Sequence, residues 1–319
     1  MTSRGRRNRI CMASRSGLCP IIMTIRILHF DVFTSQPEKG NPAGIVLSSD
    51  GLDGSAMQAV ATAVGFNDTA FVGASEKADF SIRYFSPRRE VDLCGHATVA
   101  AAIALHTEGL LASQNLPIKF SLETKAGVLP IALDLASGEL IVIMSQTPSR
   151  FKEFRGDRER LVNALGISTM DLHATLPILY GSTGRWTLIV PVRDLDAIRR
   201  MRPQTEQFPD VLVDMPDASI HPFCMETIGA NVDLHARHFS APTSGTVEDP
   251  VTGTASGVLG AYYQEFVSKH RAAEQPLVIE QGYEVGREGR VLVWADKNDD
   301  HYAVRIAGTA AYSGEKYYS

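Results

Sequence analysis

The chain has 319 residues, of which 44% are hydrophobic and 21% are charged, and its formal net charge at pH 7 is -5. This length can form two domains, and the composition is that of an ordinary globular protein. The small negative charge gives no basic surface for nucleic acid, and no apolar run approaches the ~20 residues of a membrane span. We therefore expect a cytoplasmic protein that binds neither nucleic acid nor membrane.

The first 23 residues differ in composition from the rest. Five arginines and no acidic residue precede Met23, and the apolar residues 18–23 are interrupted by Pro20. A signal peptide has a longer apolar region and a small-residue cleavage site. We expect residues 1–23 to be a disordered basic extension or the product of an upstream start, with the folded protein beginning at Met23.

The first half of the chain is predicted to consist of strands and two helices. Residues 25–33 alternate as a strand does, and residues 40–44 resemble a turn. One helix is capped by Asp53 or Ser55 and ends at Gly65. Further strands are expected at residues 45–47, 80–85, 118–122, 128–133 and 140–144.

The second half is expected to begin near residue 146, where the polar residues 149–160 indicate a solvated helix face. Helices are predicted to end at Gly166 and to span residues 195–201. Regular structure is expected to end at residues 308–310. Strands are predicted at residues 178–180, 187–192, 211–213, 223–225, 231–239, 277–280, 291–294 and 302–306.

Two stretches share one plan: an acid, a short turn, glycine and then an apolar helix. They are Asp92-Leu93-Cys94-Gly95-His96-Ala97-Thr98 and Glu248-Asp249-Pro250-Val251-Thr252-Gly253-Thr254-Ala255. The free N–H groups of a first helical turn attract anions, and glycine lets a ligand approach the backbone. Either stretch alone is typical of an ordinary capped helix. Together they indicate two similar halves that bind a small carboxylate between them.

Each half is mostly strands around one buried helix, without regular βαβ alternation. We therefore predict an α+β fold with two domains, residues 24–145 and 146–319, and leave open whether the last strand returns to the first domain. Four scattered cysteines exclude a disulfide scaffold and indicate a reducing compartment. No C-x-x-C motif or Cys/His ligand cluster is evident in the sequence, which predicts no metal site.

The ordered motifs resemble the PhzF-like phenazine-biosynthesis family within the diaminopimelate epimerase fold. The resemblance runs from about Asp31 to about Gly308. Besides the two helix-start stretches, it rests on Gly40-Asn41-Pro42, Asn67-Asp68-Thr69-Ala70-Phe71-Val72, Arg83-Tyr84-Phe85, Gln281-Gly282 and Gly286-Arg287. It implies two β-barrel-like domains, each around a central helix, with the active site in the cleft between them. It also implies a homodimer and no cofactor.

The resemblance further implies roles for individual residues. Asp68 would be the proton shuttle of a carboxylate acid/base isomerase, with His96 and Asp249 assisting the transfer. The remaining candidates would bind the substrate: Cys94, Gly95, Thr252, Gly253 and Thr254. Family members usually carry glutamate at the position of Asp68, and aspartate is shorter by one methylene.

Two alternatives stay open at this point. Related epimerases use two cysteines as bases, but the position matching the second one here is Thr252. A Cys/Thr combination resembles hydroxyproline dehydratases, so a Cys94-dependent dehydratase or epimerase of a hydroxyproline-type or amino-acid-type substrate is one alternative. A non-catalytic small-molecule binding protein of the same fold is the other.

Overall fold

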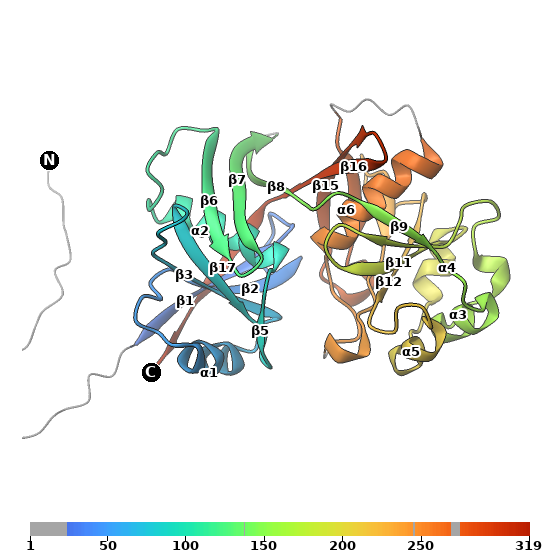
Figure 1. Cartoon of the computed structure of the whole chain (residues 1–319), viewed down its shortest axis with the longest axis horizontal. Helices are drawn as coiled ribbons and strands as arrows, with labels where there is room; N and C mark the ends of the chain where they lie inside the picture. Colours follow the sequence, from blue (N-terminus) through green and yellow to red (C-terminus); the bar gives the residue numbers. More distant parts are fainter. Residues whose placement is uncertain (1–23, 137, 245, 269–274) are drawn as a thin grey trace, which may run out of the picture.

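The computed structural model describes residues 24–136, 138–244, 246–268 and 275–319. The extension expected at residues 1–23 lies outside the described residues. Figure 1 shows two lobes side by side, which we call the N-terminal lobe and the C-terminal lobe. Within the described ranges, none of the helices combines the length and apolar character needed to cross a bilayer.

The N-terminal lobe contains the early strands, two helices and the final strand of the chain. Its helices are α1 (Gly54–Val64) and α2 (Gly95–Thr107). Its strands are β1 (Ile25–Val32), β2 (Asn41–Val46), β3 (Asp68–Gly73), β4 (Phe80–Phe85), β5 (Glu90–Val91), β6 (Ile118–Thr124), β7 (Gly127–Ala136), β8 (Glu139–Ser145) and β17 (Ala310–Tyr318). The strands are mostly antiparallel, except that β2 runs parallel to β3 and β4 to β6.

The centre of this lobe is helix α2, whose residues 97–105 are all buried. A helix that is apolar on every side is stable only when it is enclosed. Strands β1, β2, β3 and β8 pack against it. The outer helix α1 begins and ends as predicted: Asp53 accepts a hydrogen bond from the Ala56 N–H at 2.8 Å, and Gly65 is left-handed with a φ of 72°.

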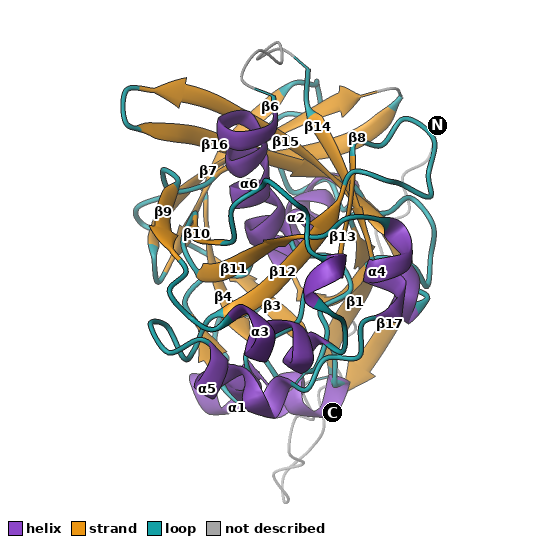
Figure 2. Ribbon diagram, turned by 90° about the vertical axis from the view of Figure 1, so that its right-hand side faces the viewer, coloured by secondary structure: helices purple, strands orange, loops and turns teal. Residues whose placement is uncertain are grey.

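The C-terminal lobe repeats the arrangement of strands around one buried helix. Its helices are α3 (Arg158–Leu165), α4 (Leu195–Arg200), α5 (Phe208–Val211) and α6 (Gly253–Tyr262). Its strands are β9 (Arg150–Glu153), β10 (Leu179–Ser182), β11 (Trp186–Pro191), β12 (Ser219–Cys224), β13 (Leu234–Ala236), β14 (Leu277–Gln281), β15 (Gly289–Asn298) and β16 (His301–Gly308). Helix α6 packs against β10, β15 and β16 and also contacts α2, as the view in Figure 2 indicates.

The chain passes between the lobes twice, and the two passages lie together. Strand β8 leads out of the N-terminal lobe and pairs antiparallel with β16, with Arg305 opposite Ser145 and Gly308 opposite Val142. The chain then returns as β17, which pairs along the length of β1. The termini of the described chain therefore meet in the N-terminal lobe.

Several predicted elements are wrong. The turn expected at residues 40–44 is mostly strand β2, whose Gly44 fits closely because an added Cβ would lie 3.1 Å from Thr69 Oγ1. Polar residues 150–153 form β9 rather than a helix, because among the described strands β9 pairs only with β10 and keeps most of its side chains in solvent. The strand predicted at residues 211–213 is wrong, because residues 208–211 form helix α5. Regular structure does not end at residues 308–310 but continues as β17. The overall class is a mixed α/β fold dominated by strands, which agrees with the predicted predominance of strands around buried helices.

Candidate active site

Three predicted site residues meet where β3 begins and α2 begins. Asp68 is the first residue of β3, Cys94 directly precedes α2, and His96 lies in the first turn of that helix. The Cys94 thiol donates to Asp68 Oδ2 at 3.2 Å and lies 3.4 Å from His96 Nδ1. His96 Nε2 lies 3.8 Å from the same Asp68 oxygen. The three groups therefore act on one another directly.

Asp68 is a carboxyl group poised to exchange protons near neutral pH. Burial raises its pKa to about 6, against the opposing effect of the Cys94 hydrogen bond, and the nearby Asp249 charge raises it further. The side chain is still 18% exposed, so a ligand can reach it. A carboxyl group with a pKa near the working pH is suited to both accepting and returning a proton.

Burial has the expected opposite effects on the two neighbours of Asp68. It raises the pKa of the Cys94 thiol, and the Asp68 charge raises it further, so this group stays a neutral thiol at pH 7. Burial lowers the pKa of His96 to about 4, which keeps the imidazole neutral. Asp68 is therefore the member of the trio that ionises in the neutral range.

The second carboxyl group, Asp249, reaches the site from the C-terminal lobe. Its oxygens accept from Thr252 Oγ1 at 2.5 Å and from Asn41 Nδ2 at 2.6 Å. Burial raises the pKa of Asp249 to about 6, and the adjacent Glu248 charge adds to the rise while these hydrogen bonds oppose it. The charge of Asp249 acts on Asp68, so the two acids are electrostatically linked across the lobe junction.

Asn41 connects Asp68 and Asp249 indirectly, because its side chain bonds both to Asp249 and to Asn67, the residue before Asp68. Its side chain is fully buried, donates to both Asp249 and the Val251 carbonyl, and accepts from Asn67 Nδ2 at 2.9 Å. Asn67 directly precedes Asp68 in the chain. The sequence placed Asn41 in a turn motif, but its role as a link between lobes was not predicted.

The two helix N-termini carry the predicted glycines, but these differ in their surroundings. In the described chain, no side chain caps the first turn of α2 or α6. A Cβ on Gly253 would lie 2.7 Å from Ile306 Cδ1, whereas one on Gly95 would meet Met144 Cε at 3.8 Å. Thr254 is half-buried in the first turn of α6, and its carbonyl accepts from Thr183 Oγ1 at 3.1 Å.

One cationic residue near the site was missed in the sequence. Arg185 lies in the β10–β11 turn, two residues beyond Thr183, and is exposed. Its charge lowers the pKa of Asp68, opposing the effect of burial. No hydrogen bond or ion pair to another described residue engages its guanidinium. The Arg185 guanidinium would therefore be able to form an ion pair with a carboxylate bound at the lobe junction.

The trio also has the chemistry of metal ligands, although the sequence predicted no metal site. The ligand atoms of Asp68, Cys94 and His96 all lie within 4.8 Å of one another. Asp68 precedes Cys94 by 26 positions in the chain, and His96 lies two residues further on. A spacing rule based on neighbouring cysteines and histidines therefore did not reveal the cluster.

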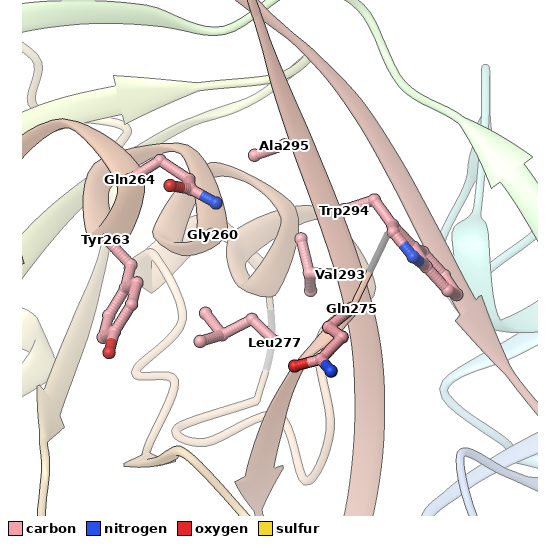
Figure 3. A pocket seen from close by; sticks show the side chains of 8 residues that line it. All are labelled: Gly260, Tyr263, Gln264, Gln275, Leu277, Val293, Trp294 and Ala295. Atoms are coloured by element: carbon pink, nitrogen blue, oxygen red, sulfur yellow. The ribbon is translucent and has the colours of Figure 1, made fainter. Parts of the chain in front are cut away.

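Two cavities lie away from these residues. The one in Figure 3, between α6 and β15, has a volume of about 10 Å³, which is roughly the space of one water molecule. The other has a volume of about 590 Å³ and is lined by residues that include Arg199, Arg237 and Glu284. Neither is lined by Asp68 or Asp249.

Two linked carboxyl groups with raised pKa values lie beside the first turns of two buried helices, and groups with such shifted pKa values are typical of enzyme sites. The phenazine biosynthesis-like protein (PhzC-PhzF) family matches residues 30–316, so the chain belongs to this family. It is 47% identical over 287 residues to the uncharacterized isomerase YfhB of Bacillus subtilis, covering 90% of this chain and 96% of that protein.

Two further relatives bear on fold and activity. The crystal structure of a Bacillus anthracis PhzF-family phenazine biosynthesis protein superposes with a TM-score of 0.90 at 49% identity, covering 93% of this chain and all of that one. The trans-2,3-dihydro-3-hydroxyanthranilate isomerase of Pseudomonas aeruginosa is 30% identical over 294 residues, covering 91% of this chain and 98% of that enzyme. The chain is an isomerase of this family.

Proposed function

We propose that this enzyme moves a proton between carbon atoms of a small cyclic or amino-acid-like carboxylate, without a cofactor. The observation that carries the proposal is Asp68, a reachable carboxyl group with a pKa of about 6 beside a neutral thiol and a neutral imidazole. Such a group is half-ionised at a pH of about 6 and mostly ionised at neutral pH, so it needs no activation by another base.

The reaction is an internal rearrangement. The Asp68 carboxylate takes a proton from one substrate carbon, the electrons of that C–H bond shift the neighbouring double bond, and the resulting carboxylic acid protonates a second carbon. The bond changes balance without an oxidant or a second substrate, and Asp68 ends each cycle ionised. Asp249 and His96 would assist by holding the substrate's polar groups, and Thr254 and the first-turn N–H groups would bind its oxygens.

The substrate is expected to be an anion. Its carboxylate would be held by the first-turn N–H groups at Gly95 and Gly253 and by the Arg185 guanidinium, which within the described chain carries no other ion pair. The dihydro-hydroxyanthranilate accepted by the Pseudomonas relative is a cyclic carboxylate of this kind. Asp68 is shorter than the usual glutamate by about 1.5 Å, and catalysis is sensitive to shifts of about 1 Å. We therefore infer that the substrate of this enzyme sits closer to β3 or differs from that compound.

The Cys94-dependent dehydratase or epimerase has less support. Such a mechanism needs a thiolate, yet burial raises the pKa of the Cys94 thiol. The thiol also donates a hydrogen bond to Asp68, which keeps its proton in place. The second cysteine is replaced by Thr252, whose hydroxyl donates a hydrogen bond to Asp249.

We also propose that the lobes are two similar epimerase-like domains and that the enzyme is a cytoplasmic homodimer. The non-catalytic alternative is set aside, because the relatives are named isomerases.

The test is solvent exchange in D2O, followed by mass spectrometry, across a panel of dihydro-hydroxyanthranilate, hydroxyprolines and free amino acids. We expect one compound to gain deuterium and to isomerise, Asp68→Asn to lose at least about 100-fold in rate, and Asp68→Glu to retain part of it. Cys94→Ala separates the alternatives. Full loss of exchange in Cys94→Ala with activity retained in Asp68→Asn would refute the carboxylate mechanism.

A further inference from the structure

We propose that Asp68, Cys94 and His96 form a three-ligand site for a borderline-soft divalent cation such as Zn2+, and that its occupation reversibly blocks the isomerase. The trio supplies one carboxylate oxygen, one sulfur and one imidazole nitrogen, which is a donor set that Zn2+ prefers. The Cys94 thiol loses its proton to solvent as the metal binds, so the sulfur coordinates as a thiolate. Magnesium and calcium prefer sites made of oxygen atoms, so they should compete poorly.

The separations of the three donor atoms are close to those around a tetrahedral metal, with one edge slightly shorter and two slightly longer. With a Zn–S bond of about 2.3 Å and Zn–N or Zn–O bonds of about 2.0–2.1 Å, neighbouring ligand atoms stand about 3.3–3.6 Å apart. In the structure, Cys94 Sγ lies 3.2 Å from Asp68 Oδ2 and 3.8 Å from His96 Nε2. The Nε2–Oδ2 edge is also 3.8 Å. Small side-chain rotations would close this triangle around one ion, without backbone movement.

The ligands are also held on rigid elements. Asp68 is the first residue of β3, and Cys94 and His96 flank the start of the enclosed helix α2. Only small parts of the Asp68 and His96 side chains reach solvent, 18% and 11% respectively. Their partial exposure would let an ion enter and would leave a fourth position for water or for the substrate carboxylate. Three protein ligands and one open position distinguish such a site from a closed, four-ligand structural zinc site.

Occupation of this site conflicts with the proposed proton transfer. The Asp68 oxygen that bonds to the cation cannot accept a substrate proton, and the ion fills the space beside the carboxylate. Zinc should therefore inhibit at one equivalent and compete with substrate, and a chelator should restore activity. The inhibitory part rests on the proposed function, whereas metal binding itself does not.

The experiment is a Co2+ titration of the full-length chain, freed of metal and kept reduced with a phosphine. We expect one equivalent of Co2+ to produce the near-ultraviolet thiolate-to-cobalt charge-transfer band, and one equivalent of Zn2+ to abolish it. Cys94→Ser should lose the band, while Asp68→Asn and His96→Gln should weaken Co2+ binding at least about tenfold. Circular dichroism would establish that each variant is folded.

The matched controls are the other cysteines. Cys224 is buried and its thiol is bonded to the Glu226 carbonyl, so Cys224→Ser should keep the band. Cys11→Ser and Cys19→Ser should keep it too. Absence of the band in the unmodified chain, or its persistence in Cys94→Ser, would overturn the site. Zinc bound at one equivalent with undiminished solvent exchange would overturn the inhibitory role. The band is read without substrate, so failure to find a substrate would count against the isomerase proposal alone.

Discussion

Asn41 Nδ2 donates to Asp249 Oδ1 at 2.6 Å, and this bond crosses from one lobe to the other over 208 positions of the chain. The donor is fully buried, and the same amide group also donates to the Val251 carbonyl. One side chain of the N-terminal lobe thus orients an acid of the C-terminal lobe.

Replacing Asn41 by alanine should therefore damage both stability and turnover. Asp249 loses a donor and the Val251 carbonyl is left unpaired in a buried place, which we expect to cost about 2–3 kcal/mol of unfolding free energy. The hydrogen bond from Asn41 lowers the pKa of Asp249, so its removal should raise that pKa above its value of about 6. Urea unfolding and kcat measure the two effects. The control is Asn67→Ala, which leaves the Asn41–Asp249 bond in place; equal loss of kcat in both variants would contradict the interpretation.

The pH dependence of kcat/KM should report the ionisation of Asp68. If its carboxylate is the base, kcat/KM is low when the group is protonated and rises with pH to a plateau above about 6. The charge of Asp249 raises the pKa of Asp68, so removing that charge in Asp249→Asn should move the rising limb to lower pH. Initial rates from about pH 4 to about pH 8, which span about 2 units on each side of a midpoint near 6, would test this. A limb that moves to higher pH in Asp249→Asn would exclude Asp68 as its source.

Arg185→Gln should weaken substrate binding more than it slows the chemical step. A charged hydrogen bond of about 1.5–3 kcal/mol corresponds to a roughly 10- to 100-fold rise in KM, with kcat changed by less than about threefold. Arg185→Lys should recover part of the affinity, because it keeps the charge but not the planar fork. Arg158 is an exposed arginine at the start of α3, and Arg158→Gln provides the control. An unchanged KM in Arg185→Gln would remove this residue from the substrate site.

The two helix-start glycines should respond differently to alanine. At Gly253 the new methyl group would lie 2.7 Å from Ile306 Cδ1 and 3.0 Å from the Phe33 ring, so we expect a loss of about 1–3 kcal/mol. At Gly95 the methyl group meets Met144 Cε at an ordinary 3.8 Å, so stability should stay within about 1 kcal/mol. Thermal unfolding measures the difference, and a Gly95→Ala variant less stable than Gly253→Ala would show that another constraint dominates.

The features that could be predicted from the sequence depend on interactions between residues close together in the chain. The start and end of α1 follow from Asp53 and Gly65, whose capping chemistry acts within four residues. Asp68, Cys94, His96 and Asp249 were predicted as site residues from ordered motifs, and the structure brings the first three into contact. Their catalytic roles stay predictions.

What could not be predicted depends on partners far away in the chain. Strand β17 has a mixed polar sequence, and its structure comes from pairing with β1, nearly the whole chain earlier. Asn41 looked like a turn residue because its partner Asp249 belongs to the other lobe. Arg185 carries no motif, and only the approach of the β10–β11 turn to β3 brings its charge near Asp68.

The pairing of β8 with β16 has a mechanical consequence. The outgoing strand and the strand that precedes the return are hydrogen-bonded to each other, from Ser145 opposite Arg305 to Val142 opposite Gly308. The two covalent links between the lobes are thus hydrogen-bonded to each other and form one two-stranded ribbon. Bending this ribbon would alter the separation of Asp68 and Asp249 without breaking the strand pairing within either lobe. The Asn41–Asp249 hydrogen bond joins the lobes, so a large bend would have to break it.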